Sequence, residues 1–286
     1  MTKQPAMIAG VRIPEQRSRE SRTPDTPVRD LVHVWLIPTD QPPPVLAKLA
    51  ALLDDEERRR AAGHRSAVER ARFVAAHGAT RRIVAAQLGL DPGGFHWRRG
   101  EHGKPEPDID AEARISISAS AQIALVAVVQ PKPAATGSAP TPREVGIDIE
   151  RVVADHEANR LAARFFPPEQ AEYIASAPEG GGPAERFATL WCRKEACVKA
   201  LGGRLVQGLG LAVQGDAPLV VRFPAAERGS EHGSRREPEL EPESQPESEP
   251  EYRVSDVPTP RHFRAAVALA GAAPYQLRCH LWSPFH

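Results

Sequence analysis

The apolar pattern of the first half of the chain predicts a strand, then helices, then strands again. Residues 31–38, "LVHVWLIP", are rich in β-branched and aromatic residues and predict a strand. Apolar positions then recur at helical spacing over 42–90, which predicts helices. Residues 113–131 predict two strands or one bent hairpin, and a linker rich in Pro, Ala, Ser and Thr follows.

The second half of the chain repeats this plan. Its apolar pattern predicts helices over 161–177 and 185–201. The stretches that predict strands are 144–152, 206–213, 218–224, 262–271 and 275–282. Because a strand, helices and further strands occur twice, we predict an α+β fold with two similar halves, 30–142 and 143–284.

Two segments lack the apolar positions that a core needs. Residues 1–29 are polar, with Pro and Arg scattered through them, and predict a disordered tail. Residues 227–253 alternate Glu with Pro and Ser, which predicts a disordered insertion in a hairpin loop. A long surface insertion adds little loop-closure entropy, so we favour a tolerated insertion over the alternative, an acidic interaction segment.

Composition excludes several classes of protein. Lys plus Arg and Asp plus Glu each number 37, and the resulting zero net charge favours neither a nucleic-acid nor a membrane partner. The three cysteines form no CxxC pair, as expected in a reducing cytosol. The N-terminus lacks the apolar core of a signal peptide, and no apolar run reaches the roughly 18 residues of a membrane helix. We therefore expect a soluble, cytoplasmic protein.

The strand around "VGIDIER" carries two acidic residues on one face. Side chains alternate along a strand, so Asp148 and Glu150 project together, opposite Ile147 and Ile149. Hard cations such as Mg²⁺ take oxygen ligands from carboxylates placed in this way. The alternative is an ordinary strand with its polar face in solvent, and this segment alone favours that alternative.

The stretch "WCRKEACVKALGG" places charge in an apolar helix. On a helical wheel Lys194 falls inside an apolar arc, and Glu195 and Lys199 lie one turn apart at its border. A surface ion pair and a lysine that extends to solvent are the alternatives. A lysine in the middle of an apolar arc instead favours a helix beside an anionic ligand. Glu195 beside Asp148 and Glu150 would complete a metal site, and the two lysines would suit a phosphate ester.

A third group of charges is basic and lies in the first half. Its members are Arg65, Arg70, Arg72, Arg98, Arg99 and Lys104. A solvated surface explains most of them. The "GKP" turn differs, because Gly103 allows close backbone approach and Pro105 stiffens the chain, which would hold Lys104 ready for a phosphate.

Five motifs together resemble one family. In chain order they are "GKP" (103–105), "SISAS" (116–120), "GIDIE" (146–150), "RFFPPEQ" (164–170) and "WCRKEACVKALGG" (191–203). This set resembles the ordered signature of 4′-phosphopantetheinyl transferases of the surfactin-synthetase-activating (Sfp) type. The last motif fills every position of the family pattern W-x-x-K-E-A-x-x-K-x-x-G. The resemblance spans about 31–284 and implies a pseudo-twofold pair of α+β halves with the active site in the cleft between them.

The resemblance implies a reaction and its participants. The enzyme would transfer the 4′-phosphopantetheine arm of coenzyme A to a serine of an apo acyl or peptidyl carrier protein, and would release adenosine 3′,5′-bisphosphate. Such carriers serve polyketide, nonribosomal-peptide or fatty-acid synthesis, or a lysine-pathway reductase, and the sequence leaves the choice open. Mg²⁺ would be required, with Mn²⁺ as a substitute. The two fused halves imply a monomer, because they already supply the cleft that smaller relatives build by oligomerising.

The resemblance also implies roles for individual residues. Asp148, Glu150 and Glu195 would hold the metal. Catalysis would fall to Asp148, Glu195 and Lys199, with Glu195 as a candidate base for the carrier serine. The residues implied in coenzyme A binding are Arg65, Arg99, Gly103, Lys104, Ser116, Ser118, Lys194 and Lys199.

One position departs from the family pattern. The family usually carries His at the fourth position of "SISAS", where it contacts phosphate, and this chain has Ala119. A non-catalytic homologue that binds coenzyme A or a carrier is therefore an alternative, which the intact Asp148, Glu195 and Lys199 argue against. A nucleic-acid module on the Arg-rich helix 58–82 ranks lower, because charge is balanced and no stacking aromatic residues accompany the arginines.

Overall fold

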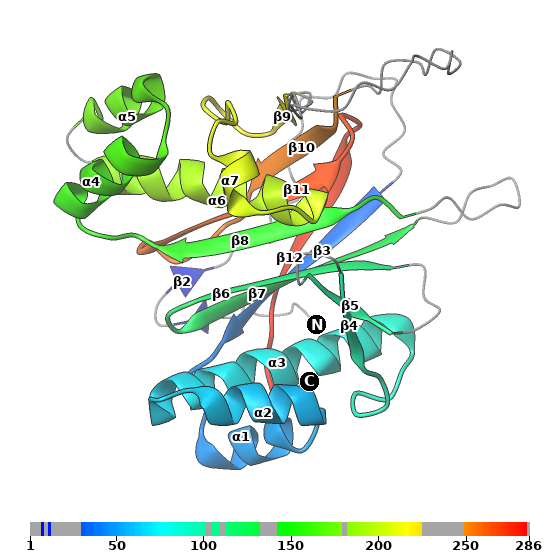
Figure 1. Ribbon diagram of the computed structural model, residues 1–286. Coiled ribbons are helices and arrows are strands. Elements are labelled where there is room, and N and C mark those ends of the chain that lie inside the picture. Colours follow the sequence, from blue (N-terminus) through cyan, green and yellow to red (C-terminus); the bar gives the residue numbers. More distant parts are fainter. Residues whose placement is uncertain are drawn as a thin grey trace, which may run out of the picture.

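Helices and strands of the protein build four layers, ordered helices, sheet, sheet, helices (Figure 1). The structure is a computed structural model. It describes residues 7–8, 11–12, 30–100, 104–108, 113–131, 142–178, 182–224 and 249–284. Two four-stranded sheets combined with several helices confirm the predicted α+β class.

The first half of the chain supplies three strands of one four-stranded sheet, a separate two-stranded sheet of β4 and β5, and one helical layer. Its strands are β3 (Asp30–Pro38), β4 (Trp97–Arg99), β5 (Pro105–Pro107), β6 (Arg114–Ser120) and β7 (Ile123–Pro131). Its helices are α1 (Pro43–Ala50), α2 (Asp55–Gly63) and α3 (Ala67–Leu88). These elements confirm the strand, the helices and the hairpin that the sequence predicted for this half.

The second half supplies the other sheet and the other helical layer. Its strands are β8 (Val145–Arg151), β9 (Leu219–Arg222), β10 (Glu251–Asp256) and β11 (Phe263–Ala270), antiparallel in the order β8–β11–β10–β9. Its helices are α4 (Asp155–Phe165), α5 (Pro168–Ala175), α6 (Pro183–Leu201) and α7 (Leu205–Gly208). The predicted helix over 185–201 is thus confirmed as most of α6.

The structure corrects two predicted elements of this half. The helix predicted over 161–177 is two helices, because Pro167 and Pro168 lack the N–H group and disfavour a helical residue before them. The strand predicted over 206–213 is instead the short helix α7 followed by irregular chain. The backbone carbonyls of Leu209 and Leu211 accept hydrogen bonds from the side chains of Gln170 and Lys194. These carbonyls are therefore satisfied without a neighbouring strand.

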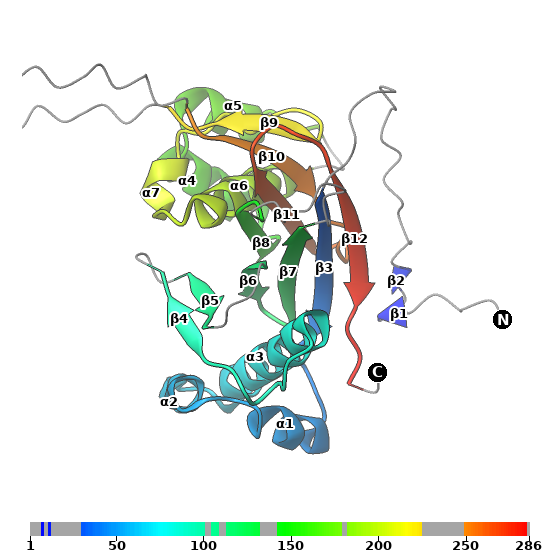
Figure 2. The ribbon, with the colours of Figure 1, turned by 90° about the vertical axis from the view of Figure 1, so that its right-hand side faces the viewer.

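The last strand crosses from the second half of the chain to the first sheet. β12 (Tyr275–Leu281) pairs in parallel with β3, which gives the first sheet the order β12–β3–β7–β6 (Figure 2). The sequence predicted this strand but assigned it to the second half. A pairing between the two ends of the chain leaves no local signal in the sequence. The two predicted halves therefore share a sheet.

Parts of the two predicted disordered segments lie outside the described residues. Within 1–29 the structure describes β1 (Met7–Ile8) and β2 (Val11–Arg12), which pair antiparallel. Within the predicted insertion, residues 227–248 lie outside the described residues. Its last residues, from Glu251 onward, belong to β10 and so to the second sheet.

One face of β8 packs into the core between the sheets, and the other face packs against α6, where the candidate site lies. Its apolar face, with Ile147 and Ile149, packs into the core between the two sheets. Its other face lies against α6. A Cβ atom on Gly146 would stand 1.9 Å from the carbonyl oxygen of Ala196, so glycine permits the close approach of α6. Asp148 is only 3% exposed beneath this helix, so its face of the strand is not an ordinary solvated one.

Candidate active site

α6 and β8 bring Lys199 and Asp148 into contact. The Nζ atom of Lys199 donates to Oδ1 of Asp148 across 2.6 Å and to Oγ of Ser118 across 3.1 Å. The simpler interpretation of the sequence paired Lys199 with Glu195 along the helix, and the structure pairs it with the strand instead. The motifs "GIDIE" and "WCRKEACVKALGG" therefore meet at this ion pair.

The carboxylates around Lys199 influence one another. Burial raises the pKa of Glu195 above its usual value, and the negative charge of Asp148 raises it further. The pKa of Glu150 is raised for the same two reasons, in the same order. Burial would lower the pKa of Lys199, but the charge and hydrogen bond of Asp148 together with the charge of Glu195 outweigh burial and leave the pKa raised. The cluster is therefore an anionic site with one fixed cation, and a second cation would relieve its repulsion.

Asp148 has one oxygen atom without a partner. Its Oδ2 is buried and makes no hydrogen bond within the part of the chain that the structure describes. An unpaired buried carboxylate oxygen is unfavourable, and a cation would satisfy it. Carboxylate oxygens are also the ligands that Mg²⁺ and Mn²⁺ prefer. The residues thus fit a hard divalent cation.

The three carboxylates do not yet enclose such an ion. In the described ranges, no group of three or more Asp, Glu, His or Cys side chains is gathered closely enough to hold a metal. The ammonium group of Lys199 instead lies on Asp148. Glu150 is held by the hydroxyl of Ser120 at 3.0 Å, whereas Glu195 is half-buried and has room for a change of side-chain rotamer toward Asp148. Binding of a cation by all three carboxylates would therefore require the side chain of Glu195 to close on it.

The "SISAS" stretch joins the two sheets. β6 is an edge strand of the first sheet and β8 an edge strand of the second. Three hydroxyls of β6 accept hydrogen bonds from three backbone N–H groups of β8; the pairs are Ser116 with Ile147, Ser118 with Ile149 and Ser120 with Arg151. Ser116 is 2% exposed and Ser118 9% exposed. Both hydroxyls are engaged inside the protein, which argues against the predicted contacts of Ser116 and Ser118 with coenzyme A.

Lys194 is likewise engaged inside the protein. It is fully buried, and its Nζ atom donates to the backbone carbonyls of Leu209 and Leu211. The ammonium group also lies 4.7 Å from the centre of the Phe166 ring. Burial lowers the pKa of Lys194 to about 8. These bonds to the chain that follows α7 argue against the predicted role of Lys194 as a ligand of coenzyme A.

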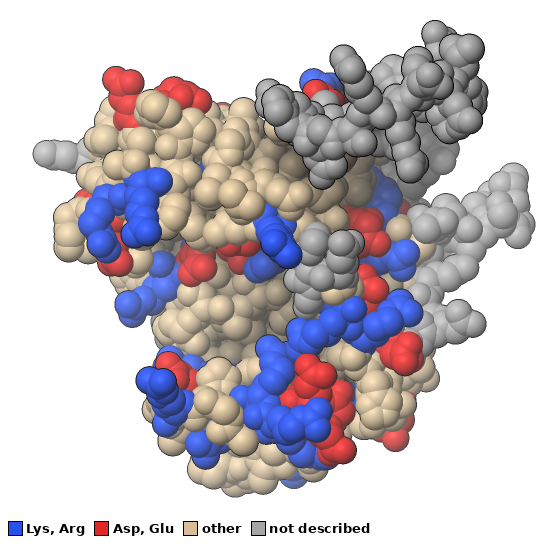
Figure 3. Space-filling model, in the orientation of Figure 1, with Lys and Arg blue, Asp and Glu red and all other residues tan. Residues whose placement is uncertain are grey.

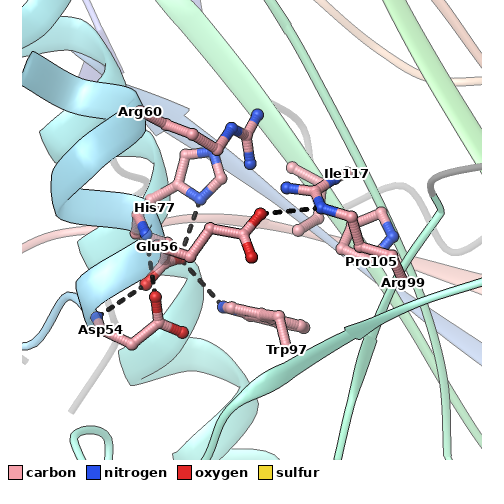
Figure 4. Close-up of a pocket in the computed structure, with 9 residues that line it drawn as sticks. Asp54, Glu56, Arg60, His77, Trp97, Arg99, Pro105 and Ile117 are labelled. Atoms are coloured by element: carbon pink, nitrogen blue, oxygen red, sulfur yellow. Dashed lines mark hydrogen bonds and ion pairs between the residues drawn. The ribbon is translucent and has the colours of Figure 1, made fainter. Parts of the chain in front are cut away.

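A pocket lies beside the "GKP" turn, between α2, α3 and β4 (Figure 4). Its lining residues are Asp54, Glu56, Glu57, Arg60, His77, Trp97, Arg99, Pro105 and Ile117. Burial lowers the pKa of Arg60, and the nearby charge of Arg99 lowers it further, so two cations share this pocket. The sequence indicated Arg99 but missed Arg60, because nothing in the run of three arginines on α2 distinguishes it from its neighbours.

The remaining predicted basic residues lie in different surroundings. Arg65 is exposed in the turn between α2 and α3. The Nζ atom of Lys104 donates to Glu144 across 2.8 Å, and Arg114 pairs with the same carboxylate. Gly103 lies outside the described residues. Of the predicted basic residues that the structure describes, only Arg99 lines the pocket, where it pairs with Glu56.

Comparison with known proteins agrees with the motifs. The model of the 4′-phosphopantetheinyl transferase superfamily matches residues 144–255. The 4′-phosphopantetheinyl transferase HetI of Nostoc sp. (strain PCC 7120) is 35% identical over 177 residues, which are 62% of this chain and 71% of HetI. The chain belongs to the 4′-phosphopantetheinyl transferase superfamily. A further relative, slr0495 of Synechocystis sp. (strain PCC 6803), is provisionally named for the same activity and is 30% identical over 180 residues, 63% of this chain and 68% of its own.

The family match covers the part of this transferase that carries the ion pair. Asp148, Glu150, Glu195 and Lys199 all lie within residues 144–255. The predicted superfamily and the predicted enzyme class, a 4′-phosphopantetheinyl transferase, are confirmed. The serines of β6 that bond to β8 (Ser116, Ser118 and Ser120, here called the serine seam) and the pocket with Arg60 precede this range. Their part in the site therefore rests on geometry and not on the family match.

Charged side chains of the transferase surround the approach to the site (Figure 3). The face drawn there is hollowed between the layer of α4–α7 and the layer of α1–α3. Lys and Arg side chains gather below the hollow, interspersed with acidic ones, over α2 and the β4–β5 pair. Although the net charge is zero, this face offers cations close to the site.

Proposed function

We propose that this transferase moves the 4′-phosphopantetheine arm of coenzyme A to a serine of an apo acyl or peptidyl carrier protein. The observation that carries the proposal is the ion pair between Lys199 and the buried Asp148, whose Oδ2 has no partner among the described residues, inside the region that matches the family. The serine oxygen would form a bond to the phosphorus that carries pantetheine. The bond from that phosphorus to the bridging oxygen would break, and adenosine 3′,5′-bisphosphate would leave with the electron pair.

Glu195 would accept the proton of the carrier serine. A raised pKa makes a carboxylate a better base near neutral pH, and burial with the charge of Asp148 raises this one. Lys199, one turn further along α6, would stay protonated because its pKa is also raised. Its positive charge would stabilise the negative charge that develops on the departing phosphate.

Asp148, Glu150 and Glu195 would hold a divalent cation, Mg²⁺ or Mn²⁺. When bound, such an ion neutralises charge on the pyrophosphate. The support is the unpartnered Oδ2 of Asp148 and the raised pKa values of the two glutamates, both of which indicate unmet demand for positive charge. Glu195 would serve as metal ligand, as base or as both.

The pocket beside β4 would contact a phosphate at the nucleotide end of coenzyme A. Arg60 and Arg99 supply two guanidinium groups for a phosphate, a type of contact that arginine makes with two parallel hydrogen bonds. Trp97 and Pro105 add apolar surface to the same pocket. This arrangement would compensate for Ala119, at which relatives usually carry a phosphate-contacting His.

The test is a mass measurement on carrier proteins. Purified transferase, coenzyme A, Mg²⁺ and a panel of apo carriers are incubated, and the intact mass of each carrier is read. We expect a gain of about 340 Da, one phosphopantetheine, on at least one carrier. Glu195→Gln should abolish the gain. The alternative, a non-catalytic homologue, predicts binding of coenzyme A or a carrier with no gain on any carrier.

The expected cellular setting stays a prediction. No helix of the described ranges combines the length and the hydrophobicity needed to cross a membrane. A monomer in the cytoplasm is what the sequence predicts. The carrier could serve polyketide, nonribosomal-peptide or fatty-acid synthesis or a lysine-pathway reductase, and the panel above would identify it.

A further inference from the structure

Three serines of β6 make the same bond to β8 but differ in their second bond. Each hydroxyl of Ser116, Ser118 and Ser120 accepts one backbone N–H of β8. The Oγ atom of Ser118 also lies 2.8 Å from Oδ1 of Asp148, and that of Ser120 lies 3.0 Å from Oε2 of Glu150. Within the described residues, Ser116 has no carboxylate partner.

The hydrogen bonds of Ser118 fix the direction of its hydroxyl. A serine hydroxyl has one hydrogen to donate and two lone pairs to accept with. Both lone pairs of Ser118 are occupied, one by the backbone N–H of Ile149 at 3.4 Å and one by Nζ of Lys199 at 3.1 Å. Its single hydrogen must therefore point to Asp148. Since Ser118 and Lys199 both act on Oδ1, the other oxygen is the one that remains unpartnered.

Ser120 constrains Glu150 in a similar way. Its lone pair accepts the backbone N–H of Arg151 at 3.1 Å, which directs its hydrogen to the carboxylate of Glu150. Glu150 is only half-buried and would otherwise choose freely among its rotamers. One hydroxyl from the first sheet thus restrains each acidic residue of "GIDIE" in the second.

We propose that Ser118 and Ser120 are positioning residues that orient Asp148 and Glu150 toward a divalent cation, whereas Ser116 only joins the sheets. This inference rests on the proposed function, because it assigns the ligand orientation of the same site. Groups that hydrogen-bond a metal ligand commonly contribute 10–100-fold to metal affinity. The serines also connect β6 of the first sheet to β8 of the second. The orientation of Asp148 and Glu150 therefore depends on how these two strands are aligned.

The test measures metal binding without the transfer reaction. Mn²⁺ is titrated into the full chain with coenzyme A present and no carrier, and free Mn²⁺ is followed by electron paramagnetic resonance. We expect Ser118→Ala to weaken Mn²⁺ binding by about 10–100-fold and Ser120→Ala to weaken it by about tenfold. Ser116→Ala is the matched control, since it also leaves one β8 N–H without its acceptor, and its Mn²⁺ affinity should stay within about twofold of wild type.

A second variant and a second readout separate positioning from general damage. Ser118→Thr keeps the hydroxyl and should restore most of the Mn²⁺ affinity. The unfolding temperature should fall in all three alanine variants, because each loses one hydrogen bond to β8, and should fall most in Ser118→Ala, which also loses its bonds to Asp148 and Lys199. If Ser116→Ala lost as much Mn²⁺ affinity as Ser118→Ala, the positioning role would be wrong.

The same experiment distinguishes failure of this inference from failure of the proposed function. Wild type that modifies a carrier, together with a Ser118→Ala variant of wild-type Mn²⁺ affinity, overturns the positioning role alone. Wild type that neither binds Mn²⁺ nor modifies any carrier overturns the proposed function and this inference with it.

Discussion

The ammonium group of Lys199 lies 2.6 Å from Oδ1 of Asp148 and joins α6 to β8 at the centre of the candidate site. Lys194 lies on the same helix, but among the described residues its ammonium group makes no contact with the candidate site. It is fully buried and bonds to the backbone carbonyls of Leu209 and Leu211. Two lysines of one motif therefore have separate tasks, one chemical and one structural.

Replacing each lysine with methionine should separate these tasks. Lys194→Met leaves the carbonyl of Leu209 without its donor and should lower the free energy of unfolding by about 1–3 kcal/mol. Its transfer rate per folded molecule should stay within about threefold of wild type. Lys199→Met should abolish transfer, because the charge beside Asp148 is lost. Urea unfolding and the carrier mass gain measure the two effects.

The opposite pattern would reverse the assignment of Lys194. A Lys194→Met variant with wild-type stability and no transfer would restore its predicted role as a ligand of coenzyme A. Lys199→Arg serves as the control for charge, since it keeps the cation while changing the shape of the head group.

The glutamates of the site should lower stability at neutral pH. In the folded protein the pKa values of Glu150 and Glu195 are raised above the usual 4.5, so the folded state holds these protons more tightly than the unfolded state. Their contribution therefore disfavours folding as pH rises through the raised values, and vanishes below about 4.5. Glu195→Gln and Glu150→Gln should each unfold at a higher temperature than wild type at pH 7, with the difference shrinking toward pH 4.5.

Thermal unfolding at a series of pH values checks this expectation. Saturating Mg²⁺ with coenzyme A should raise the unfolding temperature of wild type more than that of either variant, because binding to the folded state alone stabilises it. A Gln variant that is less stable than wild type at pH 7 would show that these carboxylates do not repel one another as argued.

Local periodicity correctly predicted which side chains share a face within a single strand or helix. The two-residue repeat of a strand placed Asp148 and Glu150 on one face, and the structure has them there, opposite the inter-sheet core. The helical repeat likewise placed Lys194 inside an apolar arc. A helical wheel cannot show which segment packs on that arc. In the structure the backbone at Leu209 and Leu211 contacts Lys194 there.

Features that depend on contacts between distant segments could not be predicted from the sequence. The pairing of β12 with β3 joins the two ends of the chain, and the seam joins edge strands of two sheets. The alternation of Ser116, Ser118 and Ser120 was visible as a pattern, but only the register with β8 shows which hydroxyls reach a carboxylate. Arg60 likewise becomes distinct from its neighbours only once α2 and β4 enclose a pocket.

The two arginines of the pocket should govern affinity for the nucleotide end of coenzyme A. Arg60→Ala and Arg99→Ala should each raise KM for coenzyme A by about tenfold, the effect of losing roughly 1.4 kcal/mol of binding. Arg58→Ala is the matched control, because Arg58 lies on the same helix, is exposed and pairs with Asp55. It should leave KM unchanged.

A substrate analogue sharpens this test. With dephospho-coenzyme A, which lacks the 3′-phosphate, wild type and the Arg60→Ala variant should have similar KM values if Arg60 contacts that phosphate. An Arg60→Ala variant that is impaired equally with both substrates would place its contact elsewhere on the nucleotide.

Gly146 should be the least replaceable residue of β8. A Cβ atom there would stand 1.9 Å from the carbonyl oxygen of Ala196 and 2.4 Å from the backbone nitrogen of Ala200, so Gly146→Ala must push α6 away from the strand. We expect a loss of about 3 kcal/mol in the free energy of unfolding. Because α6 carries Lys199, its displacement should also break the ion pair with Asp148 and abolish transfer.

Gly63→Ala is the control for the substitution itself, since nothing lies within 4 Å of a Cβ atom at that position. It should be neutral or raise stability by up to about 1 kcal/mol, because alanine favours a helix over glycine. Urea unfolding compares the two variants. Equal stability of Gly146→Ala and Gly63→Ala would mean that α6 and β8 do not approach closely enough to need glycine, and the contact between Lys199 and Asp148 would then lose its structural basis.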